Sequence, residues 1–246
     1  MKLCAIIPAR FGSKRLPGKP LLKINNQEML LLTYNSIKRV VKEKDIYVFT
    51  DAKKIKNQLS KKIRNIILFG GKFKNGTERV SFGLKKIKKK YSASLIVSCD
   101  NPFINQKPLK KTIFNYKLIE RDKEYCGSTV HLINNKIKVL KNRNIAKVVL
   151  NKKNEILYLT RSSIPFNLIK KKYFFTHHGP VCIKFHLLKK YYFMKNTPLQ
   201  LAEDNEWMKY IENGYKIKSS LIKKMPIEIN TLKELKYYRS ISRKND

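Results

Sequence analysis

Cationic side chains and glycines gather in one short segment near the start of the chain. Residues 8–21 read Pro-Ala-Arg-Phe-Gly-Ser-Lys-Arg-Leu-Pro-Gly-Lys-Pro-Leu and directly follow the apolar residues 3–7. Because a loop at the end of a buried strand can present backbone donors and cations together, Arg10, Arg15 and Lys19 are candidates for holding a polyphosphate. The segment is neither a Walker A loop nor a Gly-x-Gly-x-x-Gly turn. We interpret it as a triphosphate-binding loop, although on its own it would pass for basic surface in so lysine-rich a chain.

Four later blocks carry further side chains suited to binding or catalysis. They are Asn75-Gly76-Thr77-Glu78-Arg79, Val97-Ser98-Cys99-Asp100-Asn101-Pro102, Lys147-Val148-Val149 and Thr160-Arg161-Ser162-Ser163-Ile164-Pro165-Phe166. Taken singly, such blocks have ordinary structural explanations. Thr77 would cap a helix with Glu78 near its positive end, and Asp100 would form a turn after a strand. Their value lies in occurring together and in a particular order.

Together with residues 6–21, these blocks resemble the sequence signature of the 3-deoxy-manno-octulosonate (Kdo) cytidylyltransferases, the enzymes that make CMP-Kdo. The resemblance covers nearly the whole chain. It implies transfer of CMP from CTP to a 3-deoxy-ulosonic acid, with Kdo as the expected acceptor, and release of pyrophosphate, for lipopolysaccharide-type glycan synthesis. Two alternatives stay open: a cytidylyltransferase for another acidic sugar, and a turnover-deficient relative that binds nucleotides or polyanions.

The resemblance assigns the nucleotide site residue by residue. Arg10, Arg15 and Lys19 match positions that contact the triphosphate. Since phosphoryl transfer relies on positioning and charge neutralisation, the expected catalytic residues are Arg10, Lys19 and Asp100. The expected nucleotide-binding residues are Pro8, Ala9, Arg10, Arg15, Lys19, Gly76 and Arg79, of which the last two would contact the base.

The resemblance also implies Mg²⁺ as cofactor, with Asp100 as the principal ligand. In the block around Asp100, Cys99 replaces a family glycine and Asn101 replaces a family glutamate. The second family ligand is an aspartate, and this chain has Asn230 in its place, which would also serve as a helix N-cap. Glu228 lies two residues earlier, so in an extended segment its carboxylate would point to the same side. We expect Asp100, Asn230 and Glu228 to hold Mg²⁺, with one or two ions left open.

The sugar-acid site rests on three residues that match family positions. Arg161 matches an arginine whose planar guanidinium suits a carboxylate, and His178 and Glu206 match residues that line the same pocket. The surroundings depart from the family at His177, Cys182 and Trp207, which replace Arg, Tyr and Gln. The acceptor sugar is therefore less firmly indicated than the nucleotide chemistry.

Short apolar runs alternate with amphipathic segments, which predicts a mainly parallel sheet covered by helices and ligands at the carboxyl ends of its strands. Strands are expected at residues 3–8, 46–50, 63–69, 95–99, 125–132, 147–150, 155–160, 181–185 and 215–221, and helices at 26–41, 52–59, 77–91, 186–195, 198–213 and after Asn230. The fold class is α/β, a single-domain Rossmann-like nucleotide-diphospho-sugar transferase fold with a C-terminal sugar-binding and dimerisation insertion. Within one domain over residues 1–246, residues 1–122 are expected to bind mainly the nucleotide, and residues 123–246 the sugar acid and a second subunit.

Composition limits the other partners. The net charge is +38, but only ten of the 55 basic residues are arginine and no aromatic ladder accompanies the lysine runs. We therefore expect a solvated basic surface without specific nucleic-acid binding. The four cysteines are too dispersed for a zinc site or a disulfide framework, and no apolar run suggests a signal peptide or a membrane span. The expected protein is cytoplasmic and homodimeric, with CTP and an acidic 3-deoxy sugar as its ligands.

Overall fold

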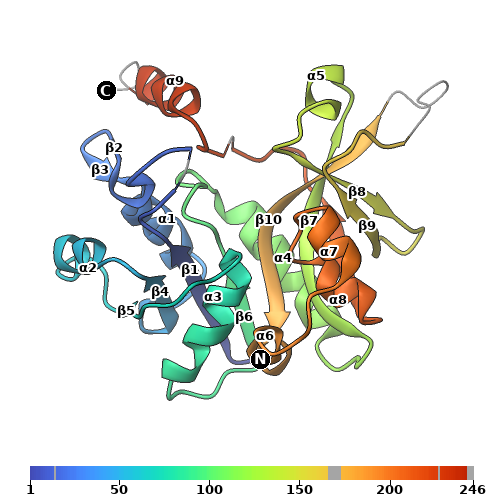
Figure 1. The fold of residues 1–246 in the computed structure, drawn as a ribbon, viewed down its shortest axis with the longest axis horizontal. Helices are drawn as coiled ribbons and strands as arrows, with labels where there is room; N and C mark the ends of the chain where they lie inside the picture. Colours follow the sequence, from blue (N-terminus) through green and yellow to red (C-terminus); the bar gives the residue numbers. More distant parts are fainter. Residues whose placement is uncertain (14, 166–172, 227, 243–246) are drawn as a thin grey trace.

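The computed structural model describes residues 1–13, 15–165, 173–226 and 228–242. Its N-terminal half is a parallel sheet in the order β6-β1-β4-β5 (Figure 1). The strands are β1 (Leu3–Ala9), β4 (Ile46–Thr50), β5 (Ile66–Leu68) and β6 (Ala93–Ile96). The predicted bounds of β4 are confirmed, and β5 and β6 are shorter than their apolar runs. Phe166, the last residue of the fourth block, lies outside the described residues.

Helices cover both faces of this sheet, which explains why its strands are apolar on both sides. Ala5 and Ile7 of β1 pack on a cluster supplied by α1 (Met29–Lys38), α2 (Lys53–Leu59) and α4 (Gln106–Ile119). Cys4 and Ile6 point the other way, toward α3 (Gly76–Gly83) and α6 (Phe185–Tyr191). The mainly parallel, helix-covered sheet predicted from the alternating pattern is therefore confirmed.

The C-terminal half continues the same sheet rather than forming a second one (Figure 1). The long strand β10 (Phe174–Lys184) runs antiparallel to β6 and to β7 (Tyr125–Asn134), and β11 (Lys216–Leu221) joins β7 in parallel. A hairpin of β8 (Ala146–Leu150) and β9 (Ile156–Thr160) pairs with the first part of β10. One continuous sheet thus connects the two halves of the expected site.

Several predicted elements needed correction. The helix predicted at 77–91 begins at Gly76 and ends at Gly83, and its cap is Asn75, whose Oδ1 accepts the Glu78 amide at 2.8 Å, so the assignment of Thr77 as cap was wrong. The segment predicted as one helix at 198–213 divides into α7 (Pro198–Ala202) and α8 (Met208–Glu212). Asp204 between them has a φ of 46°, which an α-helix excludes.

Other elements were missed because their patterns are weak. Helix α4 was not predicted, and β10 begins well before its apolar end because two neighbouring strands, β7 and β8, pair with its first half. A hairpin of β2 (Lys23–Ile24) and β3 (Gln27–Glu28) precedes α1; Asn25 and Asn26 form its turn with φ values of 45° and 57°. The remaining elements are η1 (Lys19–Leu21), η2 (Glu43–Asp45), η3 (Leu84–Lys86), α5 (Ile137–Leu140) and α9 (Leu232–Ser242).

In the described part of the chain, no helix is both long and apolar enough to cross a bilayer.

Buried His131 on β7 generates a prediction about acid stability. Burial lowers its pKa from about 6.5 to about 4, and its Nδ1 lies 2.8 Å from Ser219 Oγ. The folded protein therefore favours neutral histidine, so stability is present above pH 6.5 and is lost as the pH falls toward 4. We expect the unfolding free energy to fall by about 1–3 kcal/mol over this range on account of His131.

Urea unfolding at a series of pH values measures this fall in the unfolding free energy. His131→Asn should flatten the loss of stability between pH 6.5 and 4 relative to the unsubstituted protein. A variant with an unchanged pH slope would contradict the assignment.

Candidate active site

Three distant segments meet at the carboxyl edge of β1 and β6. Lys19 is buried at the start of η1, and its Nζ lies 3.2 Å from Asp100 Oδ2 and 3.0 Å from Asn230 Oδ1. Asp100 follows β6, the parallel neighbour of β1, which places both residues at the same edge of the sheet. The Ile229 amide donates to the Asp100 carbonyl at 2.9 Å and so holds the third segment in place.

Glu228 joins this cluster from the same extended segment. Its carboxylate accepts a bond from Asn101 Nδ2 at 3.4 Å, lies 3.7 Å from His178 Nδ1 and is 3.5 Å from Asn230 Nδ2. The side chains at positions 228 and 230 therefore lie on one side of the chain, next to Asp100. The predicted N-cap role of Asn230 is wrong, because Thr231 Oγ1 accepts the Glu234 amide and so caps α9.

The carboxyl groups of Asp100 and Glu228 have pKa values that are shifted in opposite directions. Burial raises the pKa of Asp100, and the neighbouring negative charge of Glu228 raises it further, while Lys19 acts in the opposite direction. Burial opposes ionisation of Glu228 as well, but the hydrogen bond and charge of His178, aided by Asn101, hold its pKa at about 2. Negative charge confined in this way stabilises a cation placed between the two groups.

The side chains around Asp100 that could hold a metal ion offer oxygen donors. Asp100 and Glu228 supply carboxylate oxygens, Asn230 supplies an amide oxygen, and Asn101 Oδ1 is buried without a hydrogen-bond partner. An all-oxygen set with few carboxylates suits Mg²⁺, which completes its shell with water and phosphate oxygens. Within the described ranges no three His, Cys, Asp or Glu side chains gather as a metal cluster. The residues fit Mg²⁺ shared with a phosphate ligand.

The phosphate loop of residues 8–21 and the block of residues 75–79 meet beside this cluster. A Cβ atom on Gly76 would lie 3.8 Å from Pro8 Cγ, so the start of α3 packs against the end of β1. Arg79 Nη2 lies 2.9 Å from Asp51 Oδ2, and Asp51 Oδ1 accepts the Phe11 amide of the phosphate loop at 3.3 Å. Arg79 Nη1 is buried without a partner. Asp51 was not among the site residues predicted from sequence, although its place directly after β4 was an available signal.

The remaining phosphate-loop residues differ in their contacts. Ala9 is buried as the last residue of β1, and Arg10 is exposed directly after it. Arg15 reaches the C-terminal half: its Nη1 donates to Asn144 Oδ1 at 2.7 Å and its Nη2 to Asn230 Oδ1 at 3.5 Å. Asn144 was not foreseen, because nothing in its local sequence distinguishes it from other turn residues.

The three predicted sugar-acid residues lie in separate contact groups. His178 faces Glu228, as described above. Glu206 Oε2 accepts the Thr77 amide at 3.0 Å, at the start of α3, and burial raises the pKa of its carboxyl group. Arg161 donates from Nη1 to the Arg143 carbonyl at 3.1 Å and from Nη2 to the Asp204 carbonyl at 3.2 Å.

The residues that depart from the family pattern have structural contacts of their own. His177 Nε2 lies 3.0 Å from Thr129 Oγ1 on the neighbouring strand β7. Cys182 is fully buried against the α1 and α4 side of the sheet, and Trp207 is buried in the core on the opposite face. The last two substitutions therefore contribute to packing.

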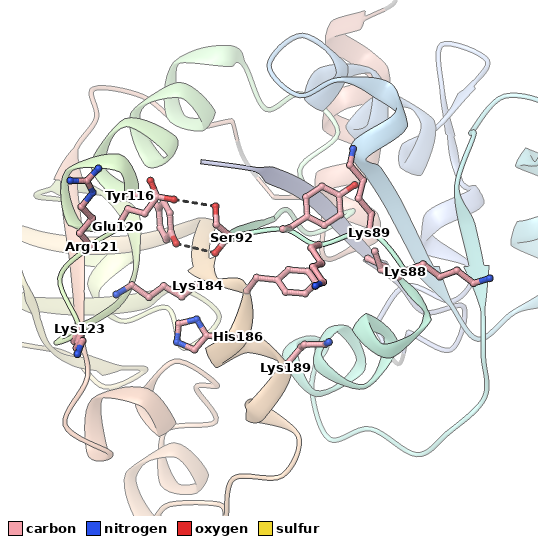
Figure 2. Close-up of a pocket in the computed structure, with 14 residues that line it drawn as sticks. Lys88, Lys89, Ser92, Tyr116, Glu120, Arg121, Lys123, Lys184, His186 and Lys189 are labelled. Atoms are coloured by element: carbon pink, nitrogen blue, oxygen red, sulfur yellow. Dashed lines mark hydrogen bonds between the residues drawn. The ribbon is translucent and has the colours of Figure 1, made fainter.

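A basic pocket of about 660 Å³ lies at the opposite edge of the sheet, where β6 begins and β10 ends (Figure 2). Three of its charged groups are engaged: Lys89 pairs with Asp45, Lys184 donates to the Asp122 carbonyl, and Glu120 accepts a bond from Ser92 Oγ. Because the phosphate loop follows the carboxyl end of β1, this pocket is separate from the cluster around Asp100.

Comparison with known proteins agrees with this geometry. The cytidylyltransferase family profile matches residues 4–222. The 3-deoxy-manno-octulosonate cytidylyltransferases of Parabacteroides distasonis and Bacteroides thetaiotaomicron are 31% and 30% identical to the chain, and each alignment covers 96% of both sequences. A solved CMP:2-keto-3-deoxy-manno-octonic acid synthetase complexed with CTP has the same fold, with a TM-score of 0.89 at 22% identity over 100% of both chains.

The fold and the matched profile define an enzyme of the nucleotidyltransferase class, a cytidylyltransferase. Within that class, the chain belongs to the 3-deoxy-manno-octulosonate cytidylyltransferase family.

The contact between Arg79 and Asp51 generates a stability prediction. The Arg79 side chain is 7% exposed, so removing its partner leaves a nearly buried charge without compensation. We expect Asp51→Ala to lower the unfolding free energy by about 1–3 kcal/mol in urea titrations. Glu124→Ala, which removes an exposed ion pair with Lys216, is the matched control and should have little effect. Equal losses in the two variants would show that Asp51 does not support Arg79.

Proposed function

We propose that the protein transfers CMP from CTP to Kdo, releasing pyrophosphate. The observation that carries this proposal is the meeting of Lys19, Asp100, Glu228 and Asn230 at the sheet edge reached by the phosphate loop. An in-line attack by a sugar oxygen on the α-phosphorus needs positioned cations more than a protein base. The names of the relatives support CTP and Kdo as the substrates.

The nucleotide would lie along the phosphate loop of residues 8–21 and the block of residues 75–79. Arg10, Arg15 and Lys19 would bind the triphosphate, and Pro8, Ala9, Gly76 and Arg79 would surround the nucleoside. In the structure Lys19 bonds to Asp100 and Asn230, so phosphate oxygens would compete for its ammonium group. Lys19 and Arg10 would then neutralise charge that develops on the α- and β-phosphates.

Mg²⁺ would be held by Asp100, Glu228 and Asn230. When bound, it would supply further charge neutralisation to the phosphates. Glu228 would restore the carboxylate that Asn230 lacks, and His178 would keep Glu228 oriented through their 3.7 Å contact.

The acidic sugar would be recognised by Arg161, His178 and Glu206. A sugar carboxylate is a charged acceptor and would compete with the two carbonyls and the exposed Asp204 carboxylate, 3.6 Å from Nη2, that Arg161 contacts. Residues 1–122 would form mainly the nucleotide part, and residues 123–246 the sugar-acid and dimer part. We further propose a cytoplasmic homodimer that acts in lipopolysaccharide-type glycan synthesis, with no specific nucleic-acid partner.

Pyrophosphate release tests the reaction directly. Purified protein with Mg²⁺, CTP and Kdo should release pyrophosphate, and ATP or GTP should give little. Lys19→Met should reduce kcat/KM by about 100-fold, because it removes a cation from the transferring phosphates. Release with another acidic sugar and not with Kdo would favour the first alternative; CTP binding without turnover would favour the second.

The altered metal site can be tested through metal dependence. Glu228→Gln removes a charge from the proposed site, so the Mg²⁺ concentration for half-maximal rate should rise about tenfold. Asn230→Asp adds a charge and should lower this concentration or leave it unchanged. Both are measured by titrating Mg²⁺ at saturating substrates. A silent Glu228→Gln together with strong acceleration in Asn230→Asp would mean that Glu228 does not replace the missing carboxylate.

A further inference from the structure

Lys147 is a fully buried lysine in the block of residues 147–149. It is not among the predicted catalytic, nucleotide-binding, sugar-binding or metal-binding residues. It lies on β8, the central strand of the β9-β8-β10 group, and pairs with Thr160 on one side and Thr176 on the other. Its side chain is 0% exposed. Burial lowers the pKa of its amine, and the charge of Arg161 lowers it further. A buried ammonium group needs strong compensation in order to persist.

The compensation comes from three backbone carbonyls. Lys147 Nζ donates to Asn142 O at 3.0 Å, to Ile145 O at 2.9 Å and to Arg161 O at 2.8 Å. These bonds use all three protons of the ammonium group. Two of the carbonyls belong to the turn at residues 142–145, and the third follows β9. Lys147 therefore joins an exposed turn to the strand end that carries Arg161.

The same turn contacts both predicted substrate sites. Asn144 accepts a bond from Arg15 of the phosphate loop at 2.7 Å. The Arg143 carbonyl accepts a bond from Arg161 at 3.1 Å. The turn is exposed at Asn142, Arg143 and Asn144. Packing of these side chains therefore does little to hold the turn in place. The buried ammonium group of Lys147 anchors two of the turn's carbonyls to the strand.

We propose that Lys147 is a positioning residue that fixes the 142–145 turn and thereby holds Arg15 and Arg161 in place for the two substrates. The identity of the two substrates rests on the proposed function. The anchoring of the 142–145 turn by Lys147 does not depend on it. Lys147 bonds to the backbone carbonyl of Arg161 and to neither guanidinium group. It acts through Asn144 on the triphosphate side and through the carbonyls of Arg143 and Arg161 on the sugar-acid side.

Lys209 provides a matched control for the loss of a buried lysine. Its side chain is 1% exposed, its Nζ donates to the Met194 carbonyl at 3.3 Å, and it lies 4.3 Å from the centre of the Tyr191 ring. Lys147→Met and Lys209→Met both remove a buried charge and keep a linear side chain. Only the first leaves the carbonyls of the 142–145 turn without their donor.

Hydrogen exchange tests the anchoring without reference to catalysis. In Lys147→Met, the amides of Asn144 and Ile145, which bond to Asn142, should exchange at least about tenfold faster, because the turn opens more often. In Lys209→Met these amides should keep their exchange rates. Equal protection of the turn in the two variants would overturn the proposal, whether or not the protein turns over CTP and Kdo.

Steady-state kinetics tests the functional consequence. Lys147→Met should raise KM for Kdo about tenfold and KM for CTP about fivefold, with a smaller change in kcat, because misplaced Arg161 and Arg15 weaken binding. Asn144→Ala, an exposed substitution that should not disturb folding, should raise KM for CTP alone. Combining it with Lys147→Met should add little to that KM, since both act on Arg15 through one contact.

The kinetic outcomes separate the two proposals. Independent, multiplicative effects of Asn144→Ala and Lys147→Met on KM for CTP would overturn the positioning role. Equal changes in KM for CTP and for Kdo in Lys147→Met and Lys209→Met would also overturn the positioning role. Absence of turnover in the unsubstituted protein would reject the proposed function, and the exchange rates would still decide whether Lys147 anchors the turn.

Discussion

The ion pair between Lys19 and Asp100 is the interaction on which the rest of the site depends. It exists because β1 and β6 are parallel neighbours, so the loops that follow them leave the sheet at the same edge. Neither charge is well solvated, and each requires compensation nearby. Asn230, Glu228 and His178 are gathered around this pair and satisfy the polar groups that the two loops bring together.

The C-terminal half completes this arrangement through the shared sheet. Strand β10 joins β6 to β7, and it carries His178 toward Glu228. The hairpin of β8 and β9 places Lys147 and the turn before it within reach of Arg15. The phosphate loop and the sugar-acid arginine are therefore connected by a short series of contacts, Arg15 to Asn144 and Arg143 to Arg161. Such a connection gives the two predicted substrate sites a common support.

Four of the departures of this chain from its family pattern fall into two physical groups. Cys182 and Trp207 are buried in the core, so their side chains are chosen by packing. Asn101 and Asn230 lie beside the two carboxylates, where each replaces a charged side chain with an amide. Glu228 brings a carboxylate into the same space, and its low pKa, held down by His178 and Asn101 against the effect of burial, keeps that carboxylate charged. The total charge of the site is thus redistributed among its segments.

The sequence by itself determined the parallel sheet, the edge at which Lys19 and Asp100 lie, and the family. Apolar runs and local motifs carry that information, because strand burial and loop position depend on residues near one another in the chain. The cap of α9 was predicted at Asn230 and lies at Thr231, although Thr231 and Glu234 have the spacing of a capping box. Only the tertiary structure placed Glu228 and His178 together, brought Asn144 to Arg15, and gave Lys147 its three carbonyls. These contacts join segments whose local patterns are those of ordinary turns and strands, so their pairing depends on the packing of the whole sheet.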